Sequence, residues 1–161
     1  MSIYLFGTKS PSDFANYLAR QDAITMDMES VGGQVIGLGI GTNELAGYYT
    51  DPQDVYALFS RHPSALDVNT TKIWHNAKAD LLALGIENSA LYPIFDTMIA
   101  ANLLGYEMLN LQYLARVVSG TTIDSFDTIT KHYKAKDLSG VPEGRIAQYN
   151  ISQIIETHKL Y

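Results

Sequence analysis

The sequence contains no cysteine, and this absence excludes disulfide bonds and thiolate metal sites. It also has no apolar run close to the roughly 20 residues that a membrane-spanning helix needs. The N-terminal residues MSIYLFGTKS lack the charged and then apolar pattern of a secretion signal. We therefore expect a cytoplasmic protein, in the host cytoplasm if it is phage-encoded, with no membrane as a partner.

Positive charge is scarce as well. Lys and Arg number 11 against 17 Asp and Glu, and the net charge is −6 at pH 7. A protein that coats duplex nucleic acid nonspecifically normally carries a strong basic excess, so the composition argues against this class. A nuclease remains compatible with it, because carboxylates clustered at a metal site add negative charge until cations bind.

The 161 residues show no repeat, low-complexity tract or linker, and we predict a single domain over residues 1–161. Hydrophobic and turn patterns predict alternating strands and helices. Strands are expected at 3–6, 23–28, 34–40, 44–50, 72–75 and 94–95, and helices at 10–20, 51–61, 77–84, 97–104, 109–118 and from 142 onward. A polar surface excursion is expected at 120–140. This order predicts an α/β fold that resembles the ribonuclease H-like architecture, a mixed sheet of about five strands flanked by helices.

Two carboxylates stand two residues apart in a predicted strand. Asp27 and Glu29 follow the apolar residues of that strand, and alternate residues of a strand point to the same face. Two carboxylates on a strand that helices cover are costly unless a cation compensates them, which favours a metal site. The alternative is that the strand ends here and both side chains are solvated.

A second polar group lies where a short strand passes into a helix. Asp80 stands about one turn into that helix, so its carboxylate can point to the end of the sheet where Asp27 lies. Asn76 and Lys78 are candidate substrate contacts. The alternative is that Asp80 is a solvated first-turn residue favoured by the helix dipole and that Asn76 is a simple N-cap.

The last predicted helix carries a polar stripe. Tyr149, Gln153 and Thr157 recur every four residues and therefore share one side of the helix. This stripe would present a phenol and a neutral amide to a site at the end of the sheet. The alternative is that Tyr149 is an amphipathic residue at the edge of the core.

A basic and aromatic segment, residues 131–136 (KHYKAK), is the best candidate for contact with a nucleic acid backbone. Lys131 and Lys134 would meet phosphates, and Tyr133 would stack on an unpaired base. A solvated loop is the alternative.

Together these motifs resemble the 3′→5′ proofreading exonuclease domain of bacterial DNA polymerase I and its phage relatives, in the tyrosine-bearing branch of the DEDD superfamily. The resemblance covers residues 24–161. It rests on the order and spacing of the segments ITMDMES, HNAKADLLAL, FDTMIAANLL, NLQYLA and YNISQIIETHKLY. It implies a role in DNA replication, with single-stranded DNA 3′ ends as substrate. A separate DNA polymerase chain is a candidate partner.

The resemblance also implies phosphodiester hydrolysis with two divalent metal ions, Mg²⁺ or Mn²⁺, about 4 Å apart at the scissile phosphate. One ion would activate water and the other would stabilise the leaving 3′-oxygen. By position, Asp27 would bridge both ions, Glu29 would bind the ion on the nucleophile side, and Asp80 would hold the second ion. Tyr149 would orient the attacking water, and Asn76 would position substrate.

The sequence departs from the family at one position. Gln153 stands where the resemblance implies a fourth carboxylate, in a Tyr-x-x-x-Asp pattern. A frame that aligns Asn150 instead breaks the match at Thr157, so Gln153 is the preferred alignment. If the lost charge weakens metal-centred stabilisation by several kcal/mol, the rate falls by roughly a thousandfold.

Three functional hypotheses remain open. The first is a 3′→5′ DNA exonuclease that is weakened or inactive as written. The second is a catalytically dead exonuclease-like module that binds nucleic acid or a protein partner. The third, an RNA-directed exonuclease of the same superfamily, is less favoured because the N-x-K-x-D form of the second motif points to the polymerase branch.

Overall fold

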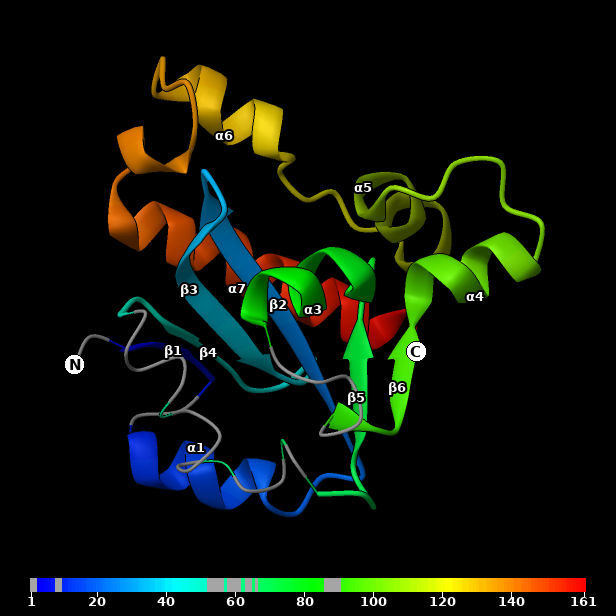
Figure 1. Ribbon diagram of the computed structural model, residues 1–161. Coiled ribbons are helices and arrows are strands. Elements are labelled where there is room, and N and C mark those ends of the chain that lie inside the picture. The colour runs from blue at the N-terminus through cyan, green and yellow to red at the C-terminus, as the bar shows by residue number, and fades with distance from the viewer. Residues whose placement is uncertain are drawn as a thin grey trace.

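A mixed sheet of six strands forms the centre of the computed structural model, which describes residues 3–7, 10–51, 57, 62, 65, 67–85 and 91–161. Helices cover the sheet on both faces (Figure 1). The predicted α/β fold is confirmed, with one strand more than the five or so expected. In the spatial order β1-β4-β3-β2-β5-β6, the strands are β1 (Ile3–Phe6), β4 (Ala46–Tyr49), β3 (Gln34–Gly41), β2 (Ala23–Val31), β5 (Thr71–Trp74) and β6 (Ile94–Asp96).

The sheet has an antiparallel half and a parallel half. β2, β3, β4 and β1 pair antiparallel, whereas β5 and β6 run parallel to β2. The pairing of β2 with β5 covers only residues 23–25, while its pairing with β3 continues to Val31. Beyond Thr25, therefore, β2 has a strand on one side only. Ligands of open α/β sheets bind at the carboxyl ends of parallel strands, and this stretch of β2 lies at that end.

The helices follow the predicted order. They are α1 (Pro11–Leu18), α3 (Ala77–Leu84), α4 (Thr97–Leu103), α5 (Leu111–Leu114) with the π-helical turn η3 (Ala115–Ser119), α6 (Phe126–His132), the 3₁₀ turn η4 (Leu138–Gly140) and α7 (Glu143–Lys159). The helix predicted at 51–61 falls almost wholly outside the described residues. Residues 120–140 are more than a surface excursion, because Ile129 of α6 and Leu138 of η4 are buried in a small core beneath α7. Within the described part of the chain, no helix has the length and apolarity needed to cross a membrane.

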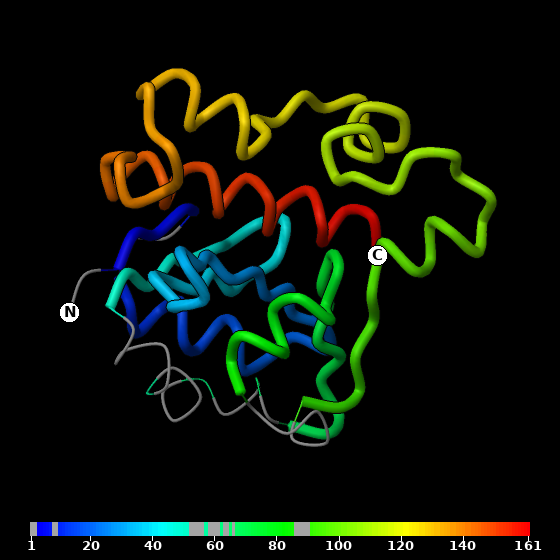
Figure 2. The backbone as a smooth tube through the Cα atoms, turned by 45° about the horizontal axis from the view of Figure 1, so that its top comes forward, coloured from blue at the N-terminus to red at the C-terminus, as the bar shows by residue number. Residues whose placement is uncertain are grey.

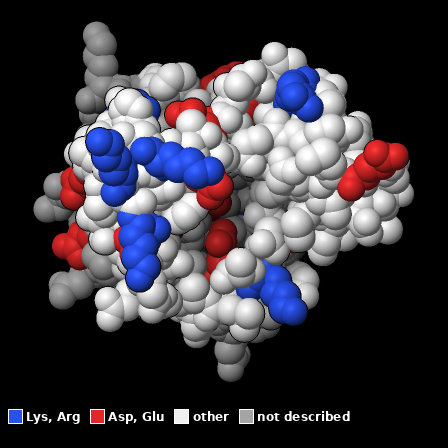
Figure 3. All heavy atoms as spheres, turned by 90° about the horizontal axis from the view of Figure 1, so that it is seen from above, with Lys and Arg blue, Asp and Glu red and all other residues white. Residues whose placement is uncertain are grey.

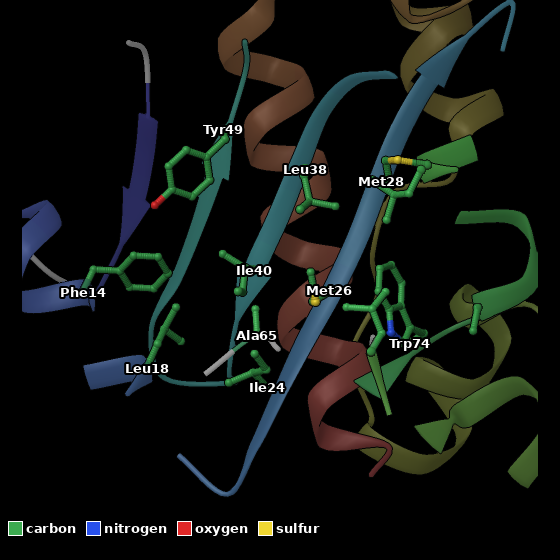
Figure 4. Close-up of a cluster of buried hydrophobic side chains, with 13 residues drawn as sticks. Phe14, Leu18, Ile24, Met26, Met28, Leu38, Ile40, Tyr49, Ala65 and Trp74 are labelled. Carbon is green, nitrogen blue, oxygen red and sulfur yellow. The ribbon is translucent and has the colours of Figure 1, made fainter. Parts of the chain in front are cut away.

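The main hydrophobic core lies on the face of the sheet turned away from α7 (Figure 4). Ile24, Met26 and Met28 of β2 point into it, together with Leu38 and Ile40 of β3. Period-two alternation sends the intervening residues to the opposite face. Met28, Trp74, Tyr48 and Tyr49 are all buried.

Helix α7 lies across that opposite face, over β2 and β3 (Figure 2). The residues of β2 that point toward it are Thr25, Asp27 and Glu29, and the register places a glycine of β3 opposite each one: Gly41, Gly39 and Gly37. Glycines have no side chain to fill the space between strand and helix. A Cβ at Gly39 would collide with Asn150 of α7, so this glycine lets α7 approach the carboxylates of β2 closely, whereas the space beside Gly37 is taken by Tyr48.

Candidate active site

Asp27 and Glu29 lie side by side on the α7 face of β2, as their spacing predicts. Asp27 is partly exposed and Glu29 is buried, with 8% of its surface accessible. Burial and the neighbouring charge of Glu29 raise the pKa of Asp27 well above its usual value. Burial, partly offset by a hydrogen bond from Asn150 and reinforced by the charge of Asp80, raises the pKa of Glu29 to about 7. The surroundings of Asp27 and Glu29 therefore carry too little positive charge to stabilise both carboxylates in their ionised form.

Asp80 of α3 comes to the open side of β2. The backbone N–H of Met28 has no strand partner on that side and donates to Asp80 Oδ2 at 3.3 Å. Burial, followed by the charge of Asp27, raises the pKa of Asp80 to about 8. Asp80 is thus not the solvated first-turn residue of the alternative interpretation: the fold brings its charge close enough to act on both carboxylates of β2.

Asp96 holds Asp80 in place through the helix that carries it. The Asp96 carboxylate accepts hydrogen bonds from Asn76 N at 3.1 Å and Ala77 N at 2.9 Å, at the start of α3. It also accepts from Met98 N at 2.9 Å, at the start of α4. One carboxylate therefore fastens the N-termini of two helices to the end of β6. In the sequence, Asp96 is part of the segment FDTMIAANLL, and no role was predicted for it.

Asn76 occupies the N-cap position of α3 without acting as a side-chain cap. Its backbone is left-handed, at φ 69° and ψ 51°, and its side chain makes no capping hydrogen bond. Both Asn76 and Lys78 are exposed; Asn76 lines a pocket together with Gln153, and Lys78 lines a different pocket between α3 and α4.

Two buried amide side chains of α7, Asn150 and Gln153, donate hydrogen bonds to different acceptors. Asn150, which is fully buried, donates from Nδ2 to Asp27 Oδ2 at 2.8 Å and to Glu29 Oε1 at 3.1 Å. Gln153, also buried, donates from Nε2 to the main-chain oxygen of Asp124 at 3.2 Å. In this structure the residue of α7 that touches the carboxylates of β2 is therefore Asn150. The signal in the sequence is Gly39, the position of β3 at which a side chain of α7 needs the space that a Cβ would occupy.

Tyr149 faces the same group of charges. Burial, followed by the negative charges of Glu29, Asp27 and Asp124, raises the pKa of its phenol far above the usual value. The phenol is therefore protonated at neutral pH and is available as a neutral hydrogen-bond donor beside the carboxylates. Tyr48 of β4, buried on the same side of the sheet, has its pKa raised by burial and by the same pair.

The basic segment at the end of α6 is placed apart from this group. Lys131 pairs with Asp127 of its own helix at 3.0 Å, and Lys134 is exposed in a left-handed conformation. The Tyr133 ring is partly buried against the small core beneath α7. Among the described residues, none of the three forms a hydrogen bond or ion pair with Asp27 or Glu29.

The site opens to solvent in a hollow. Figure 3 shows acidic side chains inside this hollow near the centre of the face and Lys and Arg side chains around it. A neighbouring pocket of about 390 Å³ is lined by the junction of β5 and α3, by α4 and α5, and by Gln153 of α7. Its walls combine polar groups such as His75 and Asn76 with apolar ones such as Met98 and Leu109. A nucleotide-sized group in this pocket would lie next to Gln153.

The donor chemistry of the site fits a divalent cation such as Mg²⁺ or Mn²⁺, which prefers oxygen ligands. Asn150 engages one oxygen of each β2 carboxylate, while Asp27 Oδ1 and Glu29 Oε2 take no hydrogen bond from the described residues and are not sealed in the interior. Within the described ranges, no three Asp, Glu or His side chains converge closely enough to enclose one ion. Asp27 and Glu29 are thus the principal oxygen pair, and Asp80 adds a nearby third charge.

Residues 7–139 match the sequence model of a 3′-5′ exonuclease family. The chain belongs to this 3′-5′ exonuclease family. The exonuclease part of the predicted resemblance is confirmed at this level. The matched segment contains Asp27, Glu29, Asp80 and Asp96, whereas α7, with Asn150 and Gln153, lies beyond it. No curated protein shows significant sequence similarity to the chain.

Solved structures share the fold at low sequence identity. NrnC of Brucella melitensis bound to pGG is 18% identical with a TM-score of 0.66, over 88% of this chain and 71% of that one. RNase D of Escherichia coli, an exoribonuclease involved in structured RNA processing, is 19% identical with a TM-score of 0.61, over 92% and 41%. The POL domain of Pol1 from M. smegmatis, in complex with DNA primer-template, is 17% identical with a TM-score of 0.63, over 94% and 25%. NrnC is also known with bound Mg²⁺.

Proposed function

We propose that this protein is a metal-dependent 3′→5′ exonuclease that removes nucleotides from single-stranded or frayed DNA 3′ ends. The observation that carries the proposal is the Asp27–Glu29 pair at the open edge of β2, each carboxylate with one oxygen free of hydrogen bonds. Membership of the 3′-5′ exonuclease family supports the reaction class. The structural neighbours include proteins described with RNA and with DNA, so the choice of DNA rests on the sequence motifs.

In the proposed reaction, Asp27, Glu29 and Asp80 would hold two divalent cations. When bound, the cations supply charge neutralisation and polarisation at the scissile phosphate. The phenol of Tyr149 is protonated, because burial and the charges of Glu29 and Asp27 raise its pKa, and as a neutral hydrogen-bond donor it would orient the attacking water. Asn76 and Lys78, both exposed, would contact the backbone of the substrate strand.

A second candidate function is a catalytically dead module that binds nucleic acid or a protein partner. It is favoured by the orientation of Gln153, whose amide is engaged with the Asp124 carbonyl and adds no charge to the carboxylate pair. On this hypothesis Lys131, Tyr133 and Lys134 remain the candidate contacts with nucleic acid.

A cleavage experiment separates these functions. The chain as written, Gln153→Asp and Asp27→Ala are each incubated with end-labelled single-stranded DNA, 3′-recessed DNA and single-stranded RNA in Mg²⁺ or Mn²⁺. We expect Gln153→Asp to shorten DNA from the 3′ end on the order of a hundredfold faster than the chain as written, since roughly 3 kcal/mol of restored transition-state stabilisation has that effect. Asp27→Ala should be inert. The matched control is Asp137→Ala, which removes a partly exposed carboxylate whose hydrogen bonds within the described part of the chain are to Ser139 alone.

Two other results would change the assignment. Shortening of RNA but not DNA would keep the exonuclease and replace its substrate. Inertness of all proteins on both substrates, with no rise in melting temperature on adding Mn²⁺, would favour the binding module, because a surviving metal site stabilises the folded state by mass action.

A further inference from the structure

Asn150 hydrogen-bonds to both carboxylates of the pair, and no other described side chain does so. Its Nδ2 lies 2.8 Å from Asp27 Oδ2, 3.1 Å from Glu29 Oε1 and 3.2 Å from the main-chain oxygen of Asp27. The side chain has no exposed surface. Among the described residues its Oδ1 takes no hydrogen bond. A buried carbonyl oxygen without a donor is costly, so the amide is held by what its nitrogen donates to.

Gly39 provides the space for this amide. It lies opposite Asp27 in the β2–β3 register, and a Cβ at this position would be 1.8 Å from Asn150 Oδ1. Any residue other than glycine would force the amide away from β2. The arrangement is therefore built by two elements, a strand that leaves a gap and a helix that fills it.

We infer that Asn150 is a positioning residue for the metal-binding carboxylates and that Gly39 is the residue that makes this positioning possible. The inference rests on the proposed function. The Nδ2 group donates to one oxygen of each carboxylate, Asp27 Oδ2 and Glu29 Oε1, and so fixes both carboxylates while it leaves Asp27 Oδ1 and Glu29 Oε2 without a hydrogen bond from the described residues. The side chain orients the carboxylates and is not itself a catalytic residue.

A neutral double donor suits this task. A lysine at position 150 would neutralise the pair and compete with a cation, whereas an aspartate would add repulsion to carboxylates whose neighbours already disfavour charge. An amide lowers the electrostatic cost of the two carboxylates while leaving their charge for a metal ion. Groups that orient metal ligands in this way typically change metal affinity by about 10- to 100-fold when they are removed.

The first test measures Mn²⁺ affinity by isothermal titration calorimetry, in the chain as written and in Asn150→Leu. Leucine keeps the branching at Cγ and the number of heavy atoms, is somewhat bulkier, and removes both N–H donors. The dissociation constant for Mn²⁺ should rise by about tenfold or more. The matched control is Gly144→Ala, on the same helix, whose added Cβ meets nothing closer than 3.6 Å and should leave the affinity unchanged.

The second test separates positioning from simple packing. Gly39→Ala alone should weaken Mn²⁺ binding as Asn150→Leu does, because the new methyl group displaces the amide. Asn150→Ala alone leaves a cavity that lowers the melting temperature. In the double variant Gly39→Ala with Asn150→Ala, the methyl group of residue 39 fills part of that cavity. The melting temperature should then recover toward that of the original chain while the Mn²⁺ affinity stays weak.

The outcomes are distinct. If the chain binds Mn²⁺ and Asn150→Leu or the folded double variant binds it equally well, the positioning role is overturned and the metal site stands. If Mn²⁺ affinity recovers together with melting temperature in the double variant, Asn150 acts only through packing and the inference is overturned. If the chain as written binds no Mn²⁺, the proposed function and this inference both fail.

Discussion

Lys72 shows how a single residue sets the geometry of this sheet. This residue of β5 has no exposed surface, although its side chain ends in an ammonium group. Its Nζ donates to the main-chain oxygens of Asp67 and Thr70, each at 2.7 Å, and of Tyr92 at 3.0 Å. All three carbonyls belong to the segments that lead into β5 and β6. The buried ammonium therefore joins the starts of two parallel strands, at the end of the sheet opposite the carboxylates.

Replacing this lysine should destabilise the fold strongly. Lys72→Met keeps most of the length of the side chain but leaves three carbonyl oxygens, that of Thr70 buried, without their donor, which is expected to lower the free energy of unfolding by about 3 kcal/mol. Urea unfolding followed by circular dichroism measures the change. Lys136→Met, at an exposed position, serves as the control and should stay within about 0.5 kcal/mol of the original chain. Equal stability of the two variants would contradict the structural role of Lys72.

Also at the scale of single residues, the sequence predicted the shared face of Asp27 and Glu29 but not the hydrogen bonds that they accept from Asn150. Period-two alternation was enough to place Asp27 and Glu29 on one face, because it depends only on local geometry. The contact of Asn150 with them depends on the register that sets Gly39 opposite Asp27, and register is a property of strand pairing between distant segments. A four-residue spacing counted from Tyr149 therefore led to Gln153, whose buried amide binds the carbonyl of Asp124.

At the scale of elements, the site depends on how α3 and α4 are fastened to the sheet. A helix N-terminus leaves backbone N–H groups without partners, and an acceptor must come from elsewhere. For both helices that acceptor is Asp96, the last residue of β6. The helix boundaries themselves were predictable, since α3 was expected at 77–84 and is found there. Its anchoring was not, because Asp96 and Asn76 are 20 residues apart.

Asp96→Ala should release both helix ends. We expect the free energy of unfolding to fall by roughly 2–3 kcal/mol, because hydrogen bonds at two N-termini are lost together. Hydrogen exchange of the Asn76, Ala77 and Met98 amides should accelerate in the same variant. Asp137→Ala is the comparison, since Asp137 caps a single short turn and, among the residues that the structure describes, hydrogen-bonds to Ser139 alone. Protection of the Asn76 and Ala77 amides that survives in Asp96→Ala would show that α3 is held by other contacts.

At the scale of the whole molecule, α7 ties the last part of the chain to the first strands of the sheet. Besides Asn150, it presents His158, whose Nδ1 lies 3.0 Å from Thr25 Oγ1 on β2. Burial lowers the pKa of His158, and the more distant charge of Glu44 opposes this shift only in part. The Tyr161 ring also faces the imidazole, at 6.4 Å between centroids. The fold therefore favours the neutral imidazole.

This preference makes the stability of the fold sensitive to acid. Because the folded pKa of His158 lies below its unfolded value of about 6.5, the contribution is fully present above that pH and is lost as the pH falls through the folded pKa. Replacing His158 with glutamine keeps a hydrogen-bonding group near Thr25 and removes the titration. The loss of unfolding free energy between about pH 7.5 and about pH 5 should therefore be smaller in His158→Gln than in the original chain. Urea unfolding at both pH values measures it, and because all other titrating groups are common to the two proteins, an identical loss in both would show that His158 is not linked to folding.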